Sequence, residues 1–304
     1  MLDPGHIPNM SASAGTTSGR PLGQDMLNIL CEVPKGPLYH YTTQKGLLGI
    51  IKHRQIWATH HQCLNDTKEF IHAKELLRVE IAKHASDHPL AEPMQRALEG
   101  PGFEDVNLYV ASFSEDPDSL GQWRAYGGPS SGFSLGFNSV NPPDRFRMVR
   151  CIYNEDRQRE IIKALIAEIL DRLHGLPSEI TETQRFARPY IDLDCRVALH
   201  RFALMLKHPK FAEEAEWRII SDTMMEDPPG QGDVPLDYRE GKSAIIPYRC
   251  VPLKGSKNDF PLTEIVIGPT PDPEQAYRSV RSLLKSQGPA NCTVRMSDVP
   301  YRAW

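Results

Sequence analysis

The sequence predicts an α+β fold built around one β-sheet. Short segments rich in β-branched and aromatic residues recur along the chain, but they do not alternate regularly with helical segments. A few longer segments carry apolar residues at helical spacing instead. Hydrophobic residues make up 40% of the chain and charged residues 24%, as in ordinary globular proteins. These observations favour an α+β fold over a doubly wound sheet.

The chain has 304 residues, which is enough for one large domain or two modest ones. Its beginning is rich in Ser, Gly, Pro and Thr and has little to bury, so we expect a flexible tail over residues 1–33. We expect a single α+β domain over residues 34–304. Helical insertions are predicted near 67–97 and 157–206.

The first half of the body predicts short strands around two helices. Leu47, Leu48 and Ile51 have helical spacing, and so do Phe70, Ala73, Leu77 and Ile81. The expected helices are 45–54 and 67–84, and the expected strands are 38–42, 56–59, 107–114, 132–137 and 148–153.

The second half of the body predicts three more helices. Gly175 stands where a glycine commonly ends a helix, and Asp272 followed by Pro273 is typical of a helix start. The expected helices are 157–174, 190–206 and one beginning at 273, and the expected strands lie near 216–221, 243–251, 264–267 and 292–296.

Charge and cysteine usage exclude several classes of protein. A net charge of −4 and a pI near 6.3 argue against a strongly electrostatic binder of nucleic acid or membranes. The six cysteines form no C-x-x-C pair, which favours reduced thiols in the cytoplasm. We find no signal peptide and no run of about 20 apolar residues.

Known cofactor motifs are also missing from the sequence. His53, His60, His61 and Cys63 have no spacing of a closed zinc site, so we predict no metal. The segment 132–137 lacks the third glycine and the following helix of a dinucleotide fingerprint.

The segment Glu214–Arg218 places polar side chains on one face of an expected strand. Period two puts Glu214, Glu216 and Arg218 on that face, and Trp217 with Ile219 on the other. Strand-borne carboxylates are suited to holding a hydroxyl or stabilising a cationic transition state. The alternative is a structural ion pair between Glu216 and Arg218.

Two other segments combine polar and aromatic residues. Ser119 is placed to cap a helical turn that carries Trp123, Arg124 and Tyr126, and these three side chains would suit a flat ring and a phosphate. The alternative is that the two aromatic residues are core. Asp66 predicts a helix cap, with Glu69 closing a capping box or lining a pocket.

Taken together, these segments and others along the chain resemble a bacterial family known as the domain of unknown function 2971. The resemblance extends from Leu38 to Arg302 and follows the order and spacing of eight segments. They are LYHYT, LND..E, ASFSE, DSL..W..YG, G.SLGF, E.EWR, IVIGP and S..PYR.

The early histidine, the serine-bearing central strand and the late E-x-E of this pattern are similar to the ADP-ribosyltransferase superfamily. That resemblance implies a split mixed or antiparallel sheet and NAD as the bound substrate. It implies that His40 contacts the ribose, with support from Thr42. Trp123 or Tyr126 would stack on the nicotinamide ring, with Ser112 behind it. Glu216 would be the catalytic carboxylate, and Glu214 would orient the acceptor.

The resemblance implies NAD-dependent ADP-ribosyl transfer or NAD hydrolysis in the bacterial cytoplasm, as a toxin, effector or phage-defence protein. The acceptor would be an unknown protein or nucleic acid. One alternative is a non-catalytic module that binds a nucleotide or a protein. Another is an RNA-processing phosphotransferase or nuclease, which predicts a basic patch around Arg124, Arg150 and Lys207.

Overall fold

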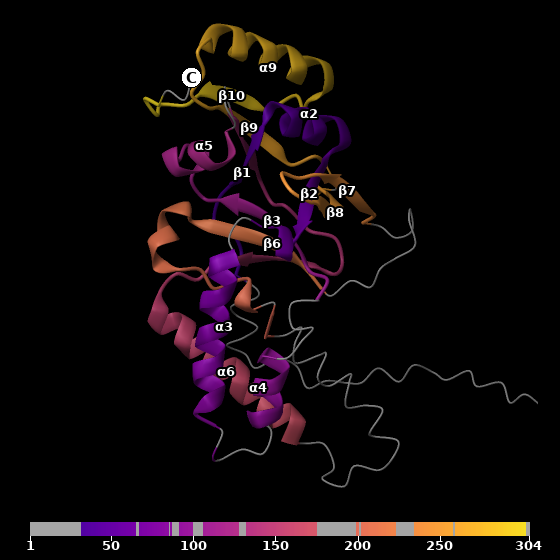
Figure 1. The fold of residues 1–304 in the computed structure, drawn as a ribbon. Helices are drawn as coiled ribbons and strands as arrows, with labels where there is room; N and C mark the ends of the chain where they lie inside the picture. The colour runs from indigo at the N-terminus through magenta and orange to yellow at the C-terminus, as the bar shows by residue number, and fades with distance from the viewer. Residues whose placement is uncertain are drawn as a thin grey trace, which may run out of the picture.

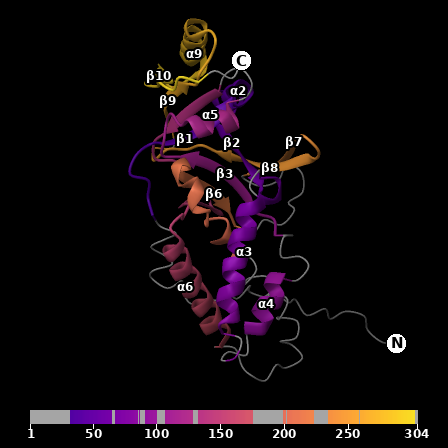
Figure 2. The same ribbon diagram turned by 60° about the vertical axis from the view of Figure 1, so that its left-hand side comes forward.

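The structure is a computed structural model of the 304-residue chain. It describes residues 32–64, 67–84, 86, 91–99, 106–127, 132–174, 199–200, 202–222, 234–257 and 259–301. Figure 1 shows a branched sheet with α9 at one end of the molecule and the helices α3, α4 and α6 at the other. Figure 2 shows the same arrangement from a second direction.

The described residues contain ten strands, and they confirm an α+β fold. The strands are β1 (Leu38–Thr43), β2 (Gln55–His60), β3 (Tyr109–Ser114), β4 (Gly132–Phe137), β5 (Phe146–Arg150), β6 (Glu216–Ser221), β7 (Leu236–Glu240), β8 (Ile245–Pro252), β9 (Leu262–Ile267) and β10 (Thr293–Met296).

The helices fall between and after these strands. They are α2 (Gln44–His53), α3 (Thr67–Ala82), α4 (Ala91–Glu99), α5 (Leu120–Tyr126), α6 (Glu155–His174) and α9 (Pro273–Gln287), with short 3₁₀ helices η1 (His61–Cys63) and η2 (Pro209–Glu214).

All ten strands belong to one open, mixed sheet. Its main path runs β10-β9-β4-β1-β3-β2-β8-β7, and β6 joins β3 to β5 off this path. The β9–β10 pair is parallel and the other pairs are antiparallel.

The sheet divides at β3. β6 pairs with β3 along residues 110–114 and so occupies one edge of that strand. On the other edge, β1 pairs only at Ser114, and β2 pairs only at Tyr109 and Val110. The two strands therefore leave β3 from opposite ends, and the helix α2 that connects them lies near this fork (Figure 1).

Two hydrophobic cores cover opposite faces of the central strands, as the period-two pattern requires. Val110 and Ile220 lie in the first core, together with residues of α3, α4 and α6. Ala111 and Ile219 lie in the second core, together with residues of α2 and α9. The helical insertions expected near 67–97 and 157–206 supply the first core.

Most of the expected elements are confirmed within one to three residues. β4 and β6 have the predicted bounds, and the Asp272 carboxylate caps α9 by accepting from the Gln275 amide at 3.0 Å. The strand expected at 148–153 is shifted toward the N-terminus: β5 begins at Phe146 and ends at Arg150. Beyond Arg150 the Cys151 amide bonds the Glu216 carbonyl, and Ile152 bridges to Leu206 instead.

One strand was not predicted, and several predicted features lie outside the described residues. β7 was not predicted, because Leu236–Glu240 is mostly exposed at the sheet edge and contains only two apolar residues. Asp66, Gly175 and most of the helix expected at 190–206 lie outside the described residues, as does nearly all of the expected tail. Within the described ranges, no helix is both long enough and apolar enough to cross a lipid bilayer.

Candidate functional site

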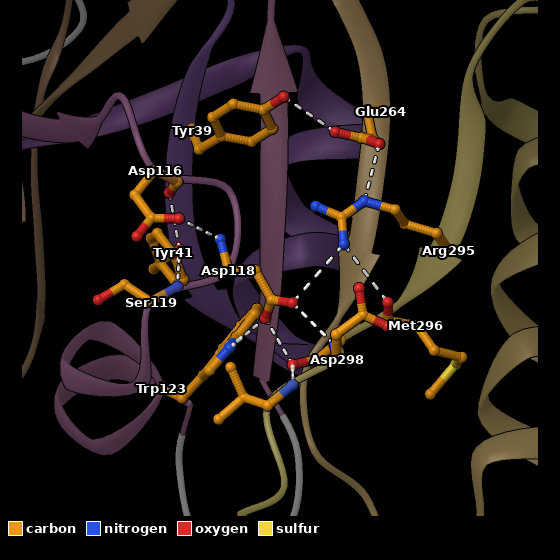
Figure 3. Close-up of polar contacts among 12 residues, drawn as sticks. Tyr39, Tyr41, Asp116, Asp118, Ser119, Trp123, Glu264, Arg295, Met296 and Asp298 are labelled. Atoms are coloured by element: carbon orange, nitrogen blue, oxygen red, sulfur yellow. Dashed lines mark hydrogen bonds and ion pairs between the residues drawn. The ribbon is translucent and has the colours of Figure 1, made fainter.

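Several of the motif segments converge on one polar cluster beside β1, which Figure 3 shows. We call it the Asp118 cluster and define it as Tyr39, Asp118, Trp123, Glu264 and Arg295. Tyr39 comes from LYHYT, Asp118 and Trp123 from DSL..W, Glu264 from β9 just before IVIGP, and Arg295 from β10. These residues lie up to 256 positions apart in the numbering, so the fold alone brings them together.

Asp118 is the centre of this cluster. Its Oδ1 accepts from the Trp123 indole at 2.8 Å and from the Ser297 hydroxyl at 2.5 Å. Its Oδ2 accepts from the Asp298 amide at 2.8 Å and lies 3.6 Å from Arg295 Nη1. Hydrogen bonds to a charged carboxylate are stronger than those between neutral groups. Asp118 therefore holds the loop between β3 and α5, the helix α5 and the segment after β10 against one another.

Arg295 connects Asp118 to Glu264. Its Nε donates to Glu264 Oε1 at 3.1 Å, and the Tyr39 hydroxyl donates to Glu264 Oε2 at 2.9 Å. Burial, followed by the hydrogen bond to Glu264, raises the pKa of Tyr39 to about 12, so this hydroxyl remains a donor at neutral pH. The side chains of Arg295, Glu264 and Asp118 are 35%, 22% and 14% exposed, so solvent reaches each of them.

Trp123 is held beneath the cluster by close packing. Its ring meets Tyr41 edge-on at 4.7 Å between centroids, and a Cβ placed on Gly268 would lie 2.9 Å from its Cε3 atom. The Tyr41 hydroxyl donates to the Asp116 carbonyl and accepts from the Ser119 amide, both at 2.8 Å. Ser119 is the N-cap residue as predicted, but its side chain makes no capping bond.

The fork in the sheet positions His40. Ser112 lies between the points at which β1 and β2 pair with β3, and its carbonyl accepts from His40 Nδ1 at 2.9 Å. Burial lowers the pKa of His40, and the bond to Ser112 offsets this only in part. The ring is therefore a neutral imidazole with its proton on Nδ1, and within the described ranges its Nε2 has no partner.

Glu216 lies in a buried network of charges. The residue is only 4% exposed. Its carboxylate accepts from Arg218 Nε at 2.7 Å, from Arg218 Nη2 at 2.9 Å and from Lys207 Nζ at 2.6 Å. Burial alone would raise its pKa, but Arg218 and Lys207 outweigh burial and lower it to about 2. Glu216 is therefore negatively charged at neutral pH, and the positive charges of Arg218 and Lys207 balance this charge.

Glu214 joins the same network from outside the strand. It lies in η2 and not in β6, because Ala215 between them adopts a left-handed conformation with φ of 42°. The strand pattern expected over Glu214–Arg218 is thus wrong for Glu214, although its Oε2 still lies 2.5 Å from Lys207 Nζ.

The remaining predicted binding residues lie in α5 and in β1. Trp123 is buried, whereas Tyr126 is 38% exposed, so Tyr126 has the more accessible ring. Arg124 is exposed and its guanidinium lies 5.3 Å from the Tyr301 ring centroid. Thr42 is half-buried in β1 and faces Gly46 of α2.

Strand register separates the predicted residues into groups. Ser114 is opposite both Tyr39 and Glu216, so these two residues share a face of the sheet. His40, next to Tyr39 in β1, lies on the other face and contacts the Phe113 ring at 5.8 Å. The structure therefore pairs His40 with Ser112 and Glu214 with Glu216, but it does not bring His40 and Glu216 together.

In the described part of the chain, no group of three or more His, Cys, Asp or Glu residues is arranged to hold a metal ion. Cys63, Cys151, Cys250 and Cys292 are in no disulfide.

Sequence reasoning did not select Asp118, Glu264 or Arg295 as site residues. Asp118 stood inside a quoted motif, so the motif was a usable signal. Glu264 and Arg295 are single charged residues in two short strands, and only the parallel pairing of β9 with β10 places them in contact.

Fold and site define an α+β protein with a forked, open sheet and, on one face, a polar cluster that includes residues of two motifs. Residues 122–219 match the family described as "Protein of unknown function (DUF2971)", and this segment belongs to that family. The resemblance inferred from the motifs is thereby confirmed over the segment from α5 to β6. Comparisons with curated proteins and with solved structures found no significant match.

Proposed function

We propose that this protein transfers ADP-ribose from NAD or hydrolyses NAD, in the bacterial cytoplasm. The observation that carries the proposal is the Asp118 cluster, in which hydrogen bonds and ion pairs hold two solvent-accessible carboxylates in fixed positions. Cleavage of NAD requires such groups. The bond between nicotinamide and C1′ of ribose breaks, its electron pair leaves with neutral nicotinamide, and C1′ becomes cationic.

A carboxylate held beside C1′ lowers the energy of this cationic transition state. In our proposal Glu264 has that role, because Tyr39 and Arg295 each hold one of its oxygens and leave further lone pairs for a ribose hydroxyl. An acceptor hydroxyl, amine or water then attacks C1′ and loses its proton to solvent or a base. Exclusion of water would decide between transfer and hydrolysis.

The charge of the cluster suits the nicotinamide end of NAD. Asp118 and Glu264 carry two negative charges, whereas Arg295 carries one positive charge. The nicotinamide ring of NAD is cationic until it leaves, so an excess of negative charge favours this part of the molecule over its phosphates. Tyr126 supplies an accessible aromatic ring in the neighbouring helix.

The ribose contact expected for His40 stays a prediction. His40 lies on the face of β1 opposite to Tyr39, so we do not include it in the proposed site around Glu264. The catalytic role expected for Glu216 stays a prediction. Its burial and its two cationic partners favour the alternative, in which Glu216 is a structural ion-pair residue.

The test is a calorimetric titration with NAD and a nicotinamide-release assay, applied to the wild type, Glu264→Gln and Glu216→Gln. Glu274→Gln is the matched control, because Glu274 is an exposed residue of α9 paired with Arg278. We expect binding by all folded chains and at least a hundredfold slower release by Glu264→Gln, about the scale of losing one electrostatic contact in a transition state. Unchanged release by a folded Glu264→Gln chain would sink the assignment of Glu264.

The same measurements separate the alternatives. Binding without release by the wild type would favour the non-catalytic nucleotide-binding module. The RNA-processing alternative predicted a basic patch that includes Lys207, but Lys207 is buried and bonded to two carboxylates. Arg150 is also paired, with Glu115 and Glu32, so these residues do not form the expected patch.

A further inference from the structure

The segment after β10 lies directly against the proposed site. We call residues 297–301 the C-terminal strap. The Ser297 amide donates to the Ile267 carbonyl at 2.7 Å, and Val299 packs against Tyr39, Tyr41, Trp123 and Val266. At its far end the Tyr301 ring lies against the Arg124 guanidinium. The strap has no regular secondary structure, so these side-chain contacts determine its position.

The strongest of these contacts are made to Asp118. Ser297 Oγ donates to Asp118 Oδ1 and also accepts from the Val299 amide at 3.1 Å, while the Asp298 amide donates to Oδ2. Figure 3 shows Asp298 and Asp118 on the same side of the cluster. With Trp123 and Arg295 also bonded, both Asp118 oxygens are occupied as long as the strap is in place.

We propose that the strap is an autoinhibitory contact, in which the Ser297 hydroxyl occupies the position on Asp118 that a ligand hydroxyl takes. This inference rests on the proposed function, because the ligand is NAD and the hydroxyl belongs to its ribose. Strap closure and ligand binding then exclude each other. The apparent affinity for NAD is reduced by the fraction of molecules in which the strap is closed.

The contacts explain how such a strap opens. Ser297 Oγ is a neutral donor to an accessible carboxylate, and the strap residues Asp298 and Pro300 are exposed. Loss of the Ser297 hydroxyl removes two bonds at once but leaves the bonds from Trp123 and Arg295 to Asp118 in place. Ser297→Ala should therefore loosen the strap without dismantling the site.

The experiment first measures the strap without ligand. Hydrogen exchange of the Asp298 and Val299 amides and carbodiimide labelling of the Asp118 carboxyl are compared in the wild type and Ser297→Ala. Ser279→Ala is the matched control, because its hydroxyl bonds only the Gln275 carbonyl on an exposed face of α9. We expect about tenfold faster exchange and labelling in Ser297→Ala, the scale of one lost bond to a charged group, and no change in the control.

Calorimetry with NAD then completes the test. Ser297→Ala should bind NAD several-fold more tightly than the wild type, and saturating NAD should speed exchange at Asp298 in the wild type. Unchanged exchange in Ser297→Ala overturns the inference, and so does equal NAD affinity in both chains while the proposed function stands. If neither chain binds NAD, the proposed function itself fails.

Discussion

Glu216→Gln should destabilise the fold far more than a surface substitution does. In the wild type, Glu214, Glu216, Lys207 and Arg218 form a network with no net charge. The change removes the negative charge that Arg218 and Lys207 share, and both of these cations are buried, with Lys207 only 1% exposed. Removing one partner of a buried ion pair costs about 3–5 kcal/mol, so we expect a loss of that size in the free energy of unfolding.

Urea denaturation measures this loss, with Glu274→Gln as the control. Glu274 pairs with Arg278 on the exposed face of α9, so its substitution should change the free energy of unfolding by less than about 1 kcal/mol. A double variant, Lys207→Met with Glu216→Gln, restores electrical balance and should be more stable than Glu216→Gln alone. A loss below about 1 kcal/mol in Glu216→Gln, together with loss of activity, would refute the structural role.

Two further predictions follow from the same structure. Because the pKa of Glu216 is lowered from 4.5 to about 2, its contribution is complete above about pH 4.5 and is lost as the pH falls through about 2. The free energy of unfolding, measured by urea denaturation between pH 7 and pH 2, should therefore fall by up to about 3 kcal/mol through this group in the wild type. The same contribution should be absent in Glu216→Gln. Gly268→Ala places a Cβ 2.9 Å from Trp123 and should destabilise the fold by about 1–3 kcal/mol. Gly49 lies in α2, and a Cβ there meets nothing within 4 Å, so Gly49→Ala should stabilise the fold by about 0.5–1 kcal/mol. Thermal melting of the two variants checks both expectations.

The sequence was a good guide to elements with strong local signals. β4 and β6 are rich in apolar residues, and Asp272 followed by Pro273 marks the start of α9, so the positions of these elements follow from short segments alone. β7 was missed because an exposed edge strand needs no apolar pattern. The order of strands in the sheet also escaped, because pairing between distant segments leaves no trace in local periodicity.

The candidate site was harder to predict than the fold. Three of the motif segments, in β1, in α5 and after β10, meet around Asp118, but their order in the chain did not predict this meeting. The sequence could not show that Glu216 faces two buried cations, since Lys207 reaches it through tertiary packing. Nor could it show that His40 and Glu216 point to opposite faces, because this depends on the pairing of Ser114 with both Tyr39 and Glu216.

The most direct test of the account is the rate of nicotinamide release from NAD by the wild type and by a folded Glu264→Gln chain. The account predicts release by the wild type and at least a hundredfold slower release by the variant, a loss of about 2.7 kcal/mol or more in transition-state stabilisation. Equal rates in the two chains would contradict the assignment of the Asp118 cluster. A folded wild type that neither binds NAD nor releases nicotinamide would contradict the proposed function as a whole.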